Sequence, residues 1–207
     1  MLHEILPVIP DFTGRYIEPF LGAGAVLFAV DFDKALVNDF NENLIEVYEV
    51  IKSEPEQLIK ALKKHVNDKE HFLAVRAWDR APGFSDRTPV ERAARFIYLN
   101  KTGFNGLYRV NSQGFFNVPF GGQKNPDYIA EDNIRQVSRY LKNVSFTSGD
   151  YRHATKKAKP GDFVYLDPPY DPISATASFV AYNESGFGKA DQEELRDEVV
   201  RLTKLGV

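Results

Sequence analysis

The hydrophobic positions in the first fifty residues alternate between short strand-like runs and segments with helical spacing. Residues 15–21 and 35–38 are short runs bounded by turn-forming or polar residues, which predicts two strands. After the glycine turn at 22–24, the apolar run at 25–30 predicts a helix. A second helix, capped by Asn41, is predicted from the spacing of Leu44, Ile45, Tyr48 and Ile51. This order of elements indicates a doubly wound α/β sheet.

From residue 53 the pattern changes to amphipathic helices without intervening strands. Thr88 and Glu91 have the spacing of a capping box, and Pro89 stands at the first helical position, so a helix is predicted to start there. Two short runs, 107–111 and 115–118, flank a Ser-Gln-Gly turn and predict a β-hairpin. Two earlier helices are predicted from the apolar spacing of Leu58, Ile59, Leu62 and Val66, and of Phe72, Val75 and Trp78.

The α/β pattern resumes after residue 130. Residues 144–148 and 162–166 predict two further strands, because each is a short run rich in β-branched or aromatic residues. Helices are predicted around them from the spacing of Ile134, Val137 and Leu141, and of Leu195, Val199 and Leu202. We therefore expect one α/β domain formed by residues 1–52 and 131–207, with residues 53–130 as a helical insertion that carries the hairpin.

Composition excludes several classes of protein. The 207 residues contain no cysteine, which rules out disulfides and thiolate zinc sites. No basic-then-apolar signal pattern opens the chain, and no apolar run approaches the length of a membrane span. We therefore expect a cytoplasmic protein. The four histidines show no ligand spacing, so no metal is predicted.

The strongest chemical signal is Asp167-Pro168-Pro169-Tyr170, directly after the predicted strand 162–166. The prolines stiffen the backbone, so a carboxylate, a fixed carbonyl and an aromatic ring are presented together where ligands bind in open α/β sheets. The Asp167 carboxylate and the Pro168 carbonyl could accept hydrogen bonds from an exocyclic amino group, while Tyr170 stacks on the base. The alternative is an ordinary turn with a solvated aspartate.

Three other strand ends carry candidate binding residues. Gly22 and Gly24 would let the backbone approach a ligand, although the third glycine of the dinucleotide fingerprint is missing. Asp39 closes the second strand, where it could bind ribose hydroxyls or simply cap a helix. Asp150, with Tyr151 beside it, could accept from the amino group of a bound adenine or cap the following helix.

The second signal is a basic window in an acidic protein. The chain has a net charge of −3, yet residues 92–124 contain five basic and no acidic residues, leaving 21 basic and 29 acidic residues elsewhere. Asparagines and aromatic side chains lie between those basic residues along the window. Such side chains bind phosphates, pair with base edges and wedge between bases, which favours a nucleic-acid surface over a merely solvated one.

Together these stretches resemble the Dam-type family of DNA adenine-N6 methyltransferases. The matching segments are 18–24, 38–41, 100–121, 167–170 and 179–182, in the family's order along nearly the whole chain. The resemblance implies a Rossmann-like S-adenosylmethionine (SAM)-dependent methyltransferase sheet with a target-recognition insertion. It implies that SAM is bound by Glu18, Phe20, Gly22, Ala23, Gly24, Asp39, Asp150, Tyr151 and Asp167, and that Asp167, Pro168, Pro169 and Tyr170 hold the flipped target adenine.

The resemblance also implies that Phe104, Asn105, Leu107, Arg109, Asn111 and Pro119 contact DNA or wedge into it. The basic window adds Arg95, Lys101 and Lys124 to this expected DNA-binding set. Three features depart from the family. The usual N-terminal segment that contacts the cofactor methionine and several C-terminal strands are not matched, so a fragment of a longer protein is expected. An arginine often stands where this chain has Gly122, so one phosphate contact is expected to be missing.

The predicted function is methylation of adenine N6 in double-stranded DNA, with base flipping and GATC as the recognition sequence, in a bacterium or phage and beside a cognate restriction endonuclease. No metal is required. Rival interpretations are methylation of cytosine N4, of RNA or of a protein amide, and a DNA- or SAM-binding fragment without activity. The sequence does not distinguish them from the residues alone.

Overall fold

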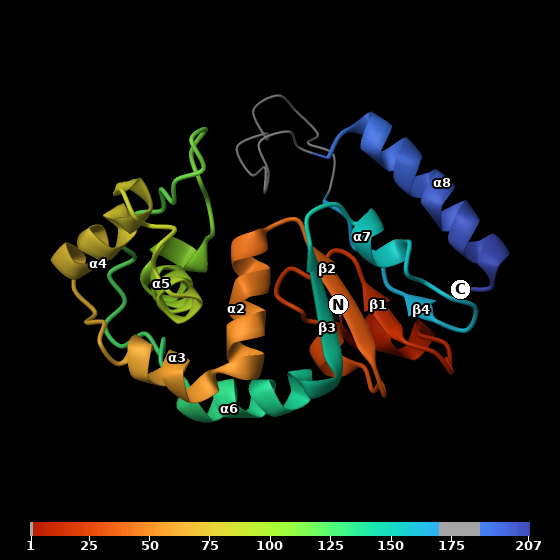
Figure 1. Ribbon diagram of the computed structural model, residues 1–207, viewed down its shortest axis with the longest axis horizontal. Coiled ribbons are helices and arrows are strands. Elements are labelled where there is room, and N and C mark those ends of the chain that lie inside the picture. Colours follow the sequence, from red (N-terminus) through yellow and green to blue (C-terminus); the bar gives the residue numbers. More distant parts are fainter. Residues whose placement is uncertain (1, 170–186) are drawn as a thin grey trace. The chain divides into compact units, whose positions relative to one another are not determined.

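A four-stranded parallel sheet forms the centre of the α/β part of the chain. The computed structural model describes residues 2–169 and 187–207. The strands are β1 (Tyr16–Glu18), β2 (Ala35–Asp39), β3 (Val144–Ser148) and β4 (Phe163–Val164), in the spatial order β3-β2-β1-β4 (Figure 1). All three neighbouring pairs are parallel, so the carboxyl ends of the strands meet at one edge of the sheet.

Eight α-helices and five 3-10 turns are assigned within the described ranges. The α-helices are α1 (Leu2–Ile5), α2 (Glu42–Ser53), α3 (Pro55–Leu62), α4 (Lys69–Arg76), α5 (Pro89–Thr102), α6 (Glu131–Tyr140), α7 (Arg152–Thr155) and α8 (Lys189–Leu205). The 3-10 turns are η1 (Leu6–Val8), η2 (Leu27–Ala29), η3 (Ala77–Arg80), η4 (Phe104–Gly106) and η5 (Leu141–Asn143). No described helix combines the length and the apolar character that crossing a bilayer requires.

The chain divides into two compact units. Unit 1 comprises residues 1–45 and 143–207, and unit 2 comprises residues 46–142. These borders lie outside the expected ones at 53 and 130, because both flanking helices carry side chains that bond within unit 2. Arg135 of α6 forms an ion pair with Glu56 of α3 at 2.7 Å, and the Ser138 hydroxyl donates to the Lys52 carbonyl at 3.2 Å.

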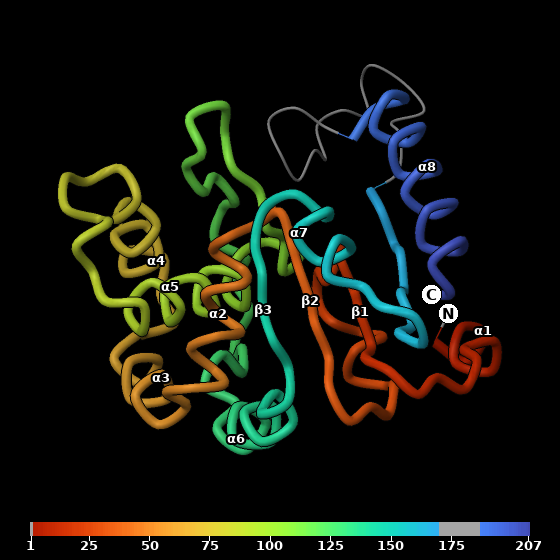
Figure 2. Tube along the Cα trace, turned by 45° about the vertical axis from the view of Figure 1, so that its right-hand side comes forward, coloured from red at the N-terminus to blue at the C-terminus, as the bar shows by residue number. Residues whose placement is uncertain are grey.

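The core of unit 1 forms where α7 and α8 cover one face of the sheet. Ile17 and Leu36 of the two central strands pack with Leu202 of α8 and with two alanines, Ala154 and Ala158. Figure 2 shows α8 running back along β4 towards the carboxyl terminus. This packing holds the strands in place and leaves their carboxyl edge to the loops that follow them.

Local signals in the sequence correctly placed several elements. Thr88 and Glu91 form the predicted capping box at the start of α5, where the Thr88 hydroxyl accepts from the Glu91 amide and the Glu91 carboxylate accepts from the Thr88 amide. The Asn41 side chain accepts from the Leu44 amide at 3.3 Å at the start of α2. The strand predicted at 144–148 is β3, and the strand predicted at 35–38 is β2 extended by Asp39.

Two predicted elements are different in the structure. The helix expected at 25–30 is only the 3-10 turn η2, since six residues before Asp31 leave room for little more than one turn. No strands are assigned in the segment expected to be a hairpin. One antiparallel bridge joins Val110 to Phe116 there, because the Asn111 side chain accepts from the Gln113 and Phe115 amides and closes a tight turn instead of a ladder.

Two predicted core positions are also exposed. Val66 lies beyond α3, which ends at Leu62, and Val199 lies on α8 between the buried Leu195 and Leu202. The strand expected over 162–166 is the two-residue β4, half-buried rather than buried, although the Tyr165 amide still donates to the Ile17 carbonyl at 2.9 Å.

Candidate active site

The carboxyl edge of the sheet brings together the acidic residues that the sequence singled out on separate strands. Glu18 ends β1, Asp39 ends β2, Asp150 follows β3 by two residues, and Asp167 follows β4 by three. Their meeting follows from the parallel register, since β1 pairs with both β2 and β4 and β2 pairs with β3. Loops after parallel strands are the usual place for ligand binding in this architecture.

Asp39 anchors the glycine turn through its carboxylate. The Gly22 amide donates to Asp39 Oδ2 and the Asn41 amide donates to Asp39 Oδ1, both at 2.8 Å. Burial raises the pKa of Asp39, and these two main-chain donors partly offset the rise. The carboxylate therefore ties the loop after β1 to the end of β2.

The glycine turn leaves space for a ligand beside its backbone. Gly22 and Gly24 have φ angles of +49° and +68°, a conformation that favours glycine. No described atom lies within 4 Å of the position that a Cβ of residue 22 would occupy. Ala23 between them is exposed. This open face is what a cofactor lying against the backbone requires.

Asn38, a fully buried residue that the sequence did not single out for a role, links two of the loops at this edge. Its side-chain nitrogen donates to the Pro19 carbonyl at 3.2 Å and to the Gly149 carbonyl at 2.9 Å. Its side-chain oxygen accepts from the Thr147 hydroxyl at 2.9 Å. Every hydrogen-bonding group of the amide except one lone pair is thus used, and the loops after β1 and β3 share one anchor.

Glu18 is a carboxyl group in an almost closed environment, with 2% of the residue exposed. Burial raises its pKa to about 7, and the negative charge of Asp167 contributes to the rise. The Tyr16 hydroxyl donates to Glu18 Oε2 at 2.8 Å and opposes the rise, as does the main chain at Leu27. The effect of Asp167 on Glu18 places the two carboxyl groups in one electrostatic environment.

The Asp-Pro-Pro segment leaves β4 without regular secondary structure. Asp167 is exposed, and Pro168 and Pro169 are half-buried. The Gln192 side chain of α8 donates to the Pro169 carbonyl at 3.3 Å and fixes the far end of the segment. Tyr170 and the matching stretch 179–182 lie outside the described residues, so the expected stacking of Tyr170 is a prediction only.

An aromatic cluster borders the loops after β1 and β3. The Phe20 and Tyr151 rings stack at 5.3 Å, and Phe187 meets the Phe20 ring edge-on at 5.8 Å. The buried Tyr151 hydroxyl has no hydrogen-bond partner among the described atoms. A buried hydroxyl without a partner is uncommon and is accounted for if a bound polar ligand supplies the missing bond.

Asp150 is already engaged within the chain. Its Oδ1 atom accepts from the amide and from Nε of Arg152, both at 2.8 Å, and its Oδ2 atom accepts from Arg152 Nη2 at 2.6 Å. These bonds lower the pKa of Asp150. Asp150 therefore bonds chiefly to Arg152 at the start of α7, whose N-cap is Tyr151, and both of its predicted roles remain predictions.

Most of the residues expected to bind DNA are exposed on unit 2. Phe104 and Leu107 are 49% and 47% exposed, which is unusual for large apolar side chains. Asn105 adopts a positive φ of 53° in the turn η4 between them. The other exposed members of the expected set are Lys101, Arg109, Pro119 and Lys124.

Two members of that set are used inside the protein. Arg95 is only 8% exposed, and its guanidinium forms an ion pair with Asp79 at 2.7 Å and donates to the carbonyls of Val75 and Arg76. A buried guanidinium bonded through Nε and Nη2 within the protein does not face a phosphate, so we remove Arg95 from the candidate DNA surface. Asn111 is half-buried, and its side-chain oxygen closes the turn at 111–115.

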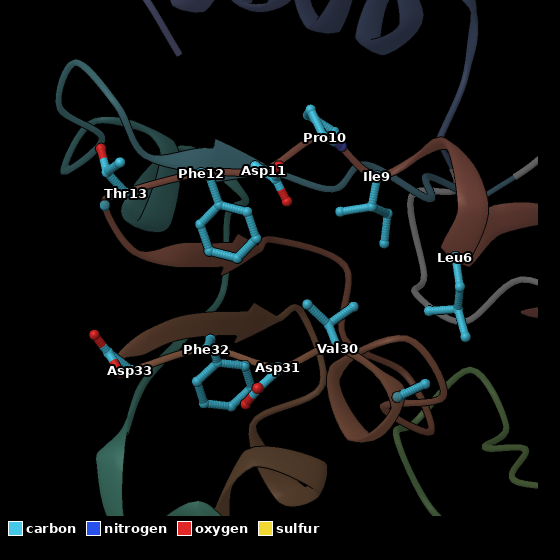
Figure 3. Close-up of a pocket in the computed structure, with 12 residues that line it drawn as sticks. Leu6, Ile9, Pro10, Asp11, Phe12, Thr13, Val30, Asp31, Phe32 and Asp33 are labelled. Carbon is cyan, nitrogen blue, oxygen red and sulfur yellow. The ribbon is translucent and has the colours of Figure 1, made fainter.

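A separate cavity of about 640 Å³ lies at the opposite edge of the sheet. Residues 6–14 and 29–33 line it, just before β1 and β2 begin, and Ile9 and Val30 project towards each other across it (Figure 3). None of the residues that the sequence singled out lines this cavity. We therefore place the candidate site at the carboxyl edge.

Sequence reasoning missed two further features. Phe40, directly after Asp39, is 57% exposed at the carboxyl edge, and an exposed ring there offers a surface for a base. Asp79 lies sixteen residues before Arg95 and bonds to it only in the folded chain, so no local pattern indicated it. The only sequence signal for Phe40 was an aromatic residue directly after an aspartate that ends a predicted strand.

Comparison with known proteins connects these features. The family model described as D12 class N6 adenine-specific DNA methyltransferase matches residues 1–204. The chain is 44% identical over 211 residues to the Type II methyltransferase M1.LlaDCHI of Lactococcus lactis subsp. cremoris, which covers 100% of this chain and 74% of that protein. It is 40% identical over 205 residues to the Type II methyltransferase M.MjaIII of Methanocaldococcus jannaschii (93% and 71%) and 35% identical over 181 residues to the DNA adenine methylase of Escherichia coli strain K12 (87% and 65%). The chain is thus shorter than these relatives.

Proposed function

The chain belongs to the family of D12 class N6 adenine-specific DNA methyltransferases, and we propose that it methylates N6 of an adenine flipped out of duplex DNA, with GATC as the recognition sequence. The methyl donor is SAM. The observation that carries the proposal is the meeting of the glycine turn, Asp39 and the Asp-Pro-Pro segment at one edge of a parallel sheet.

The residues at that edge suit SAM. The open face of Gly22 accommodates the methionine part, together with Phe20, Ala23 and Gly24. Asp39 accepts hydrogen bonds from the ribose hydroxyls, and Tyr151, whose hydroxyl has no partner among the described residues, lies with Asp150 on the loop assigned to the adenine end. Glu18 contributes a buried carboxyl behind the turn. When bound, SAM supplies a methyl group activated by the sulfonium charge.

Catalysis rests on acceptors at the end of β4. The Asp167 carboxylate and the Pro168 carbonyl accept hydrogen bonds from the two N–H groups of the adenine N6 amine, so the nitrogen becomes pyramidal and its lone pair points at the methyl carbon. With SAM bound, the nitrogen would take the methyl group as the carbon–sulfur bond breaks, and would lose one proton through the Asp167 carboxylate to solvent. Fixed acceptors stabilise the positive charge that develops on the nitrogen. Pro169 and Tyr170 complete the pocket for the base.

Unit 2 is the proposed target-recognition domain, with residues 46–142 as its extent. Exposed basic side chains bind the phosphates and base edges, and the exposed apolar side chains of Phe104 and Leu107 wedge into the duplex. The set comprises Lys101, Phe104, Asn105, Leu107, Arg109, Asn111, Pro119 and Lys124. Two relatives are named Type II methyltransferases, so we also propose a cognate restriction endonuclease that cuts the same sequence.

The Asp167→Ala variant tests the proposal. We expect it to lose methyl transfer by at least about 10²-fold, because one of the two acceptors for the amine is gone. Mass spectrometry of nucleosides from DNA incubated with protein and SAM quantifies N6-methyladenine and N4-methylcytosine in one run. It therefore also shows whether neither product forms. DNA binding, followed by fluorescence anisotropy, should be largely retained.

A matched control keeps this test specific. Asp197→Ala removes another exposed aspartate, from α8, where its carboxylate pairs with the neighbouring Arg196, and should leave transfer unchanged. Near-normal methylation by Asp167→Ala would defeat the catalytic assignment. N4-methylcytosine as the product of the unaltered protein would defeat the proposed base.

A further inference from the structure

The segment of unit 2 that carries Arg109 is held by a neighbouring 3-10 turn, η3. Arg80 Nη2 donates to the Phe116 carbonyl at 2.7 Å, and the Phe116 amide donates to Asp79 Oδ2 at 2.8 Å. Arg76, just before η3, donates through Nη1 to the Val118 carbonyl at 3.2 Å. Three bonds thus attach the backbone of residues 116–118 to η3 and the residue before it.

Asp79 is the centre of this attachment. Its Oδ1 atom accepts from Arg80 Nη1 at 2.7 Å, and its Oδ2 atom is 2.7 Å from Arg95 Nη2 as well as bonded to the Phe116 amide. The side chains of Asp79 and Arg95 are 9% and 10% exposed. Charge-assisted bonds shielded from water are strong and directional, so Asp79 fixes where Phe116 lies.

The position of Phe116 is passed on to Arg109. Phe116 forms the antiparallel bridge with Val110, and the Asn117 amide donates to the Arg109 carbonyl at 3.0 Å. The Arg109 side chain in turn donates through Nε to Asn117 Oδ1 at 2.7 Å, while the residue itself is exposed. A shift of residues 116–117 therefore moves both the backbone and the guanidinium of Arg109.

We propose that Asp79, with Arg80 and Arg95, is a positioning device for target specificity, holding the 109–117 segment in the one register that presents Arg109 to the DNA bases. The proposal rests on the DNA-reading role proposed above for that segment. The side chains of Asp79 and Arg95 are about nine-tenths buried, and both Asp79 oxygens and Arg95 Nε and Nη2 are bonded within the protein, so the two residues act on recognition through the segment that they hold.

The direct test measures discrimination in the Arg80→Ala and Asp79→Asn variants. The substrate is a duplex with the sequence that the unaltered protein methylates, identified by sequencing of methylated DNA, beside duplexes with one altered base pair. We expect the ratio of kcat/KM for the two kinds of duplex to fall by about 10–100-fold, because a base-reading guanidinium displaced by about 1 Å loses its geometry. The loss should appear as a raised KM for the cognate duplex, with SAM affinity unchanged by calorimetry.

Glu56→Gln is the matched control, since it breaks an exposed ion pair with Arg135 elsewhere in unit 2 and should leave the ratio unchanged. Thermal unfolding shows whether each variant is folded. If Asp79→Asn is not, Arg80→Ala decides, because it removes the bond to the Phe116 carbonyl and leaves the Asp79–Arg95 pair intact. An unchanged ratio in folded Arg80→Ala, or an equal loss on all duplexes, would overturn the positioning role.

Arg109→Ala, alone and combined with Arg80→Ala, separates this proposal from the function on which it rests. If Arg80 acts through Arg109, the double variant discriminates no worse than Arg109→Ala alone. Additive losses would contradict the positioning role while leaving Arg109 as a reader of DNA. No effect of Arg109→Ala on site preference would instead defeat the proposed DNA-reading segment.

Discussion

The carboxyl edge of the sheet and the 104–124 segment of unit 2 are built on opposite principles. At the edge, carboxylates are drawn inward and bonded by main-chain amides, as Asp39 is by Gly22 and Asn41. In the segment, large apolar and basic side chains are exposed, and the fixing groups are the buried Arg95, Arg80 and the aspartate Asp79 on neighbouring elements. The first arrangement suits a small ligand of constant shape. The second suits contact with a large partner at a surface that is held from behind.

The burial of carboxylates at the edge of the sheet is tested most strongly at Glu18, which is the most deeply buried of them. Its pKa rises from an ordinary value of 4.5 to about 7 on folding, so the folded state binds its proton more tightly than the unfolded state. The contribution of Glu18 to stability is therefore complete below pH 4.5 and is lost as the pH rises through about 7. The loss amounts to about 3 kcal/mol of unfolding free energy.

Glu18→Gln should remove that dependence. Chemical denaturation from pH 4.5 to 8.5 should show the variant and the unaltered protein about equally stable at the acid end, with the variant gaining by about 3 kcal/mol at the alkaline end. Glu193→Gln, an exposed position on α8, controls for the loss of one negative charge. A constant difference between Glu18→Gln and the unaltered protein across this range would show that the Glu18 carboxyl does not titrate as described.

A smaller effect is expected from Asp39→Ala. The variant loses the acceptor for the Gly22 and Asn41 amides, and with it the shape of the glycine turn. Bonds to charged groups contribute about 1.5–3 kcal/mol, so SAM affinity measured by calorimetry should fall by roughly 10–100-fold. Asp33→Ala, just before the opposite end of the same strand, should bind SAM normally. Equal affinities of the two variants would remove Asp39 from the cofactor site.

The smallest effect is expected at Lys124, an exposed basic residue at the end of the window without acidic residues. Lys124→Ala should weaken binding of all duplexes alike, because a phosphate contact carries no sequence information. The slope of log K against log salt concentration should decrease in magnitude by about 1. Lys60→Ala on α3 lies outside the window and should leave the slope unaltered. A change in site preference with Lys124→Ala would instead make Lys124 a reader of bases.

The edge of the sheet was largely predictable from sequence, because its residues follow strands that have strong local signals. Asp39 comes directly after an apolar run, and the parallel order of strands fixes which loops meet. The capping box at Thr88 was predictable for the same reason, since both partners lie within four residues. What these residues bind is supported by the family and the geometry together.

The support of the 104–124 segment was not predictable. Arg95 looked like a DNA contact because it stands in a basic window, whereas its partner Asp79 is sixteen residues earlier and meets it only in the folded chain. The hairpin failed for a local reason, since the Asn111 side chain competes for the amides that a ladder would use. Charge patterns in a sequence do not distinguish a cation that faces solvent from one that holds a loop.

One buried amide has a consequence for how this edge can change. The side-chain nitrogen of Asn38 donates to the Pro19 and Gly149 carbonyls, so the loops after β1 and β3 are held together by one residue. A change in the backbone of one loop, made to fit one end of an elongated ligand, therefore also shifts the loop that contacts the other end. We therefore expect a changed preference for a modified methyl donor to arise from the side chains around these two loops, because the backbones of the loops move together.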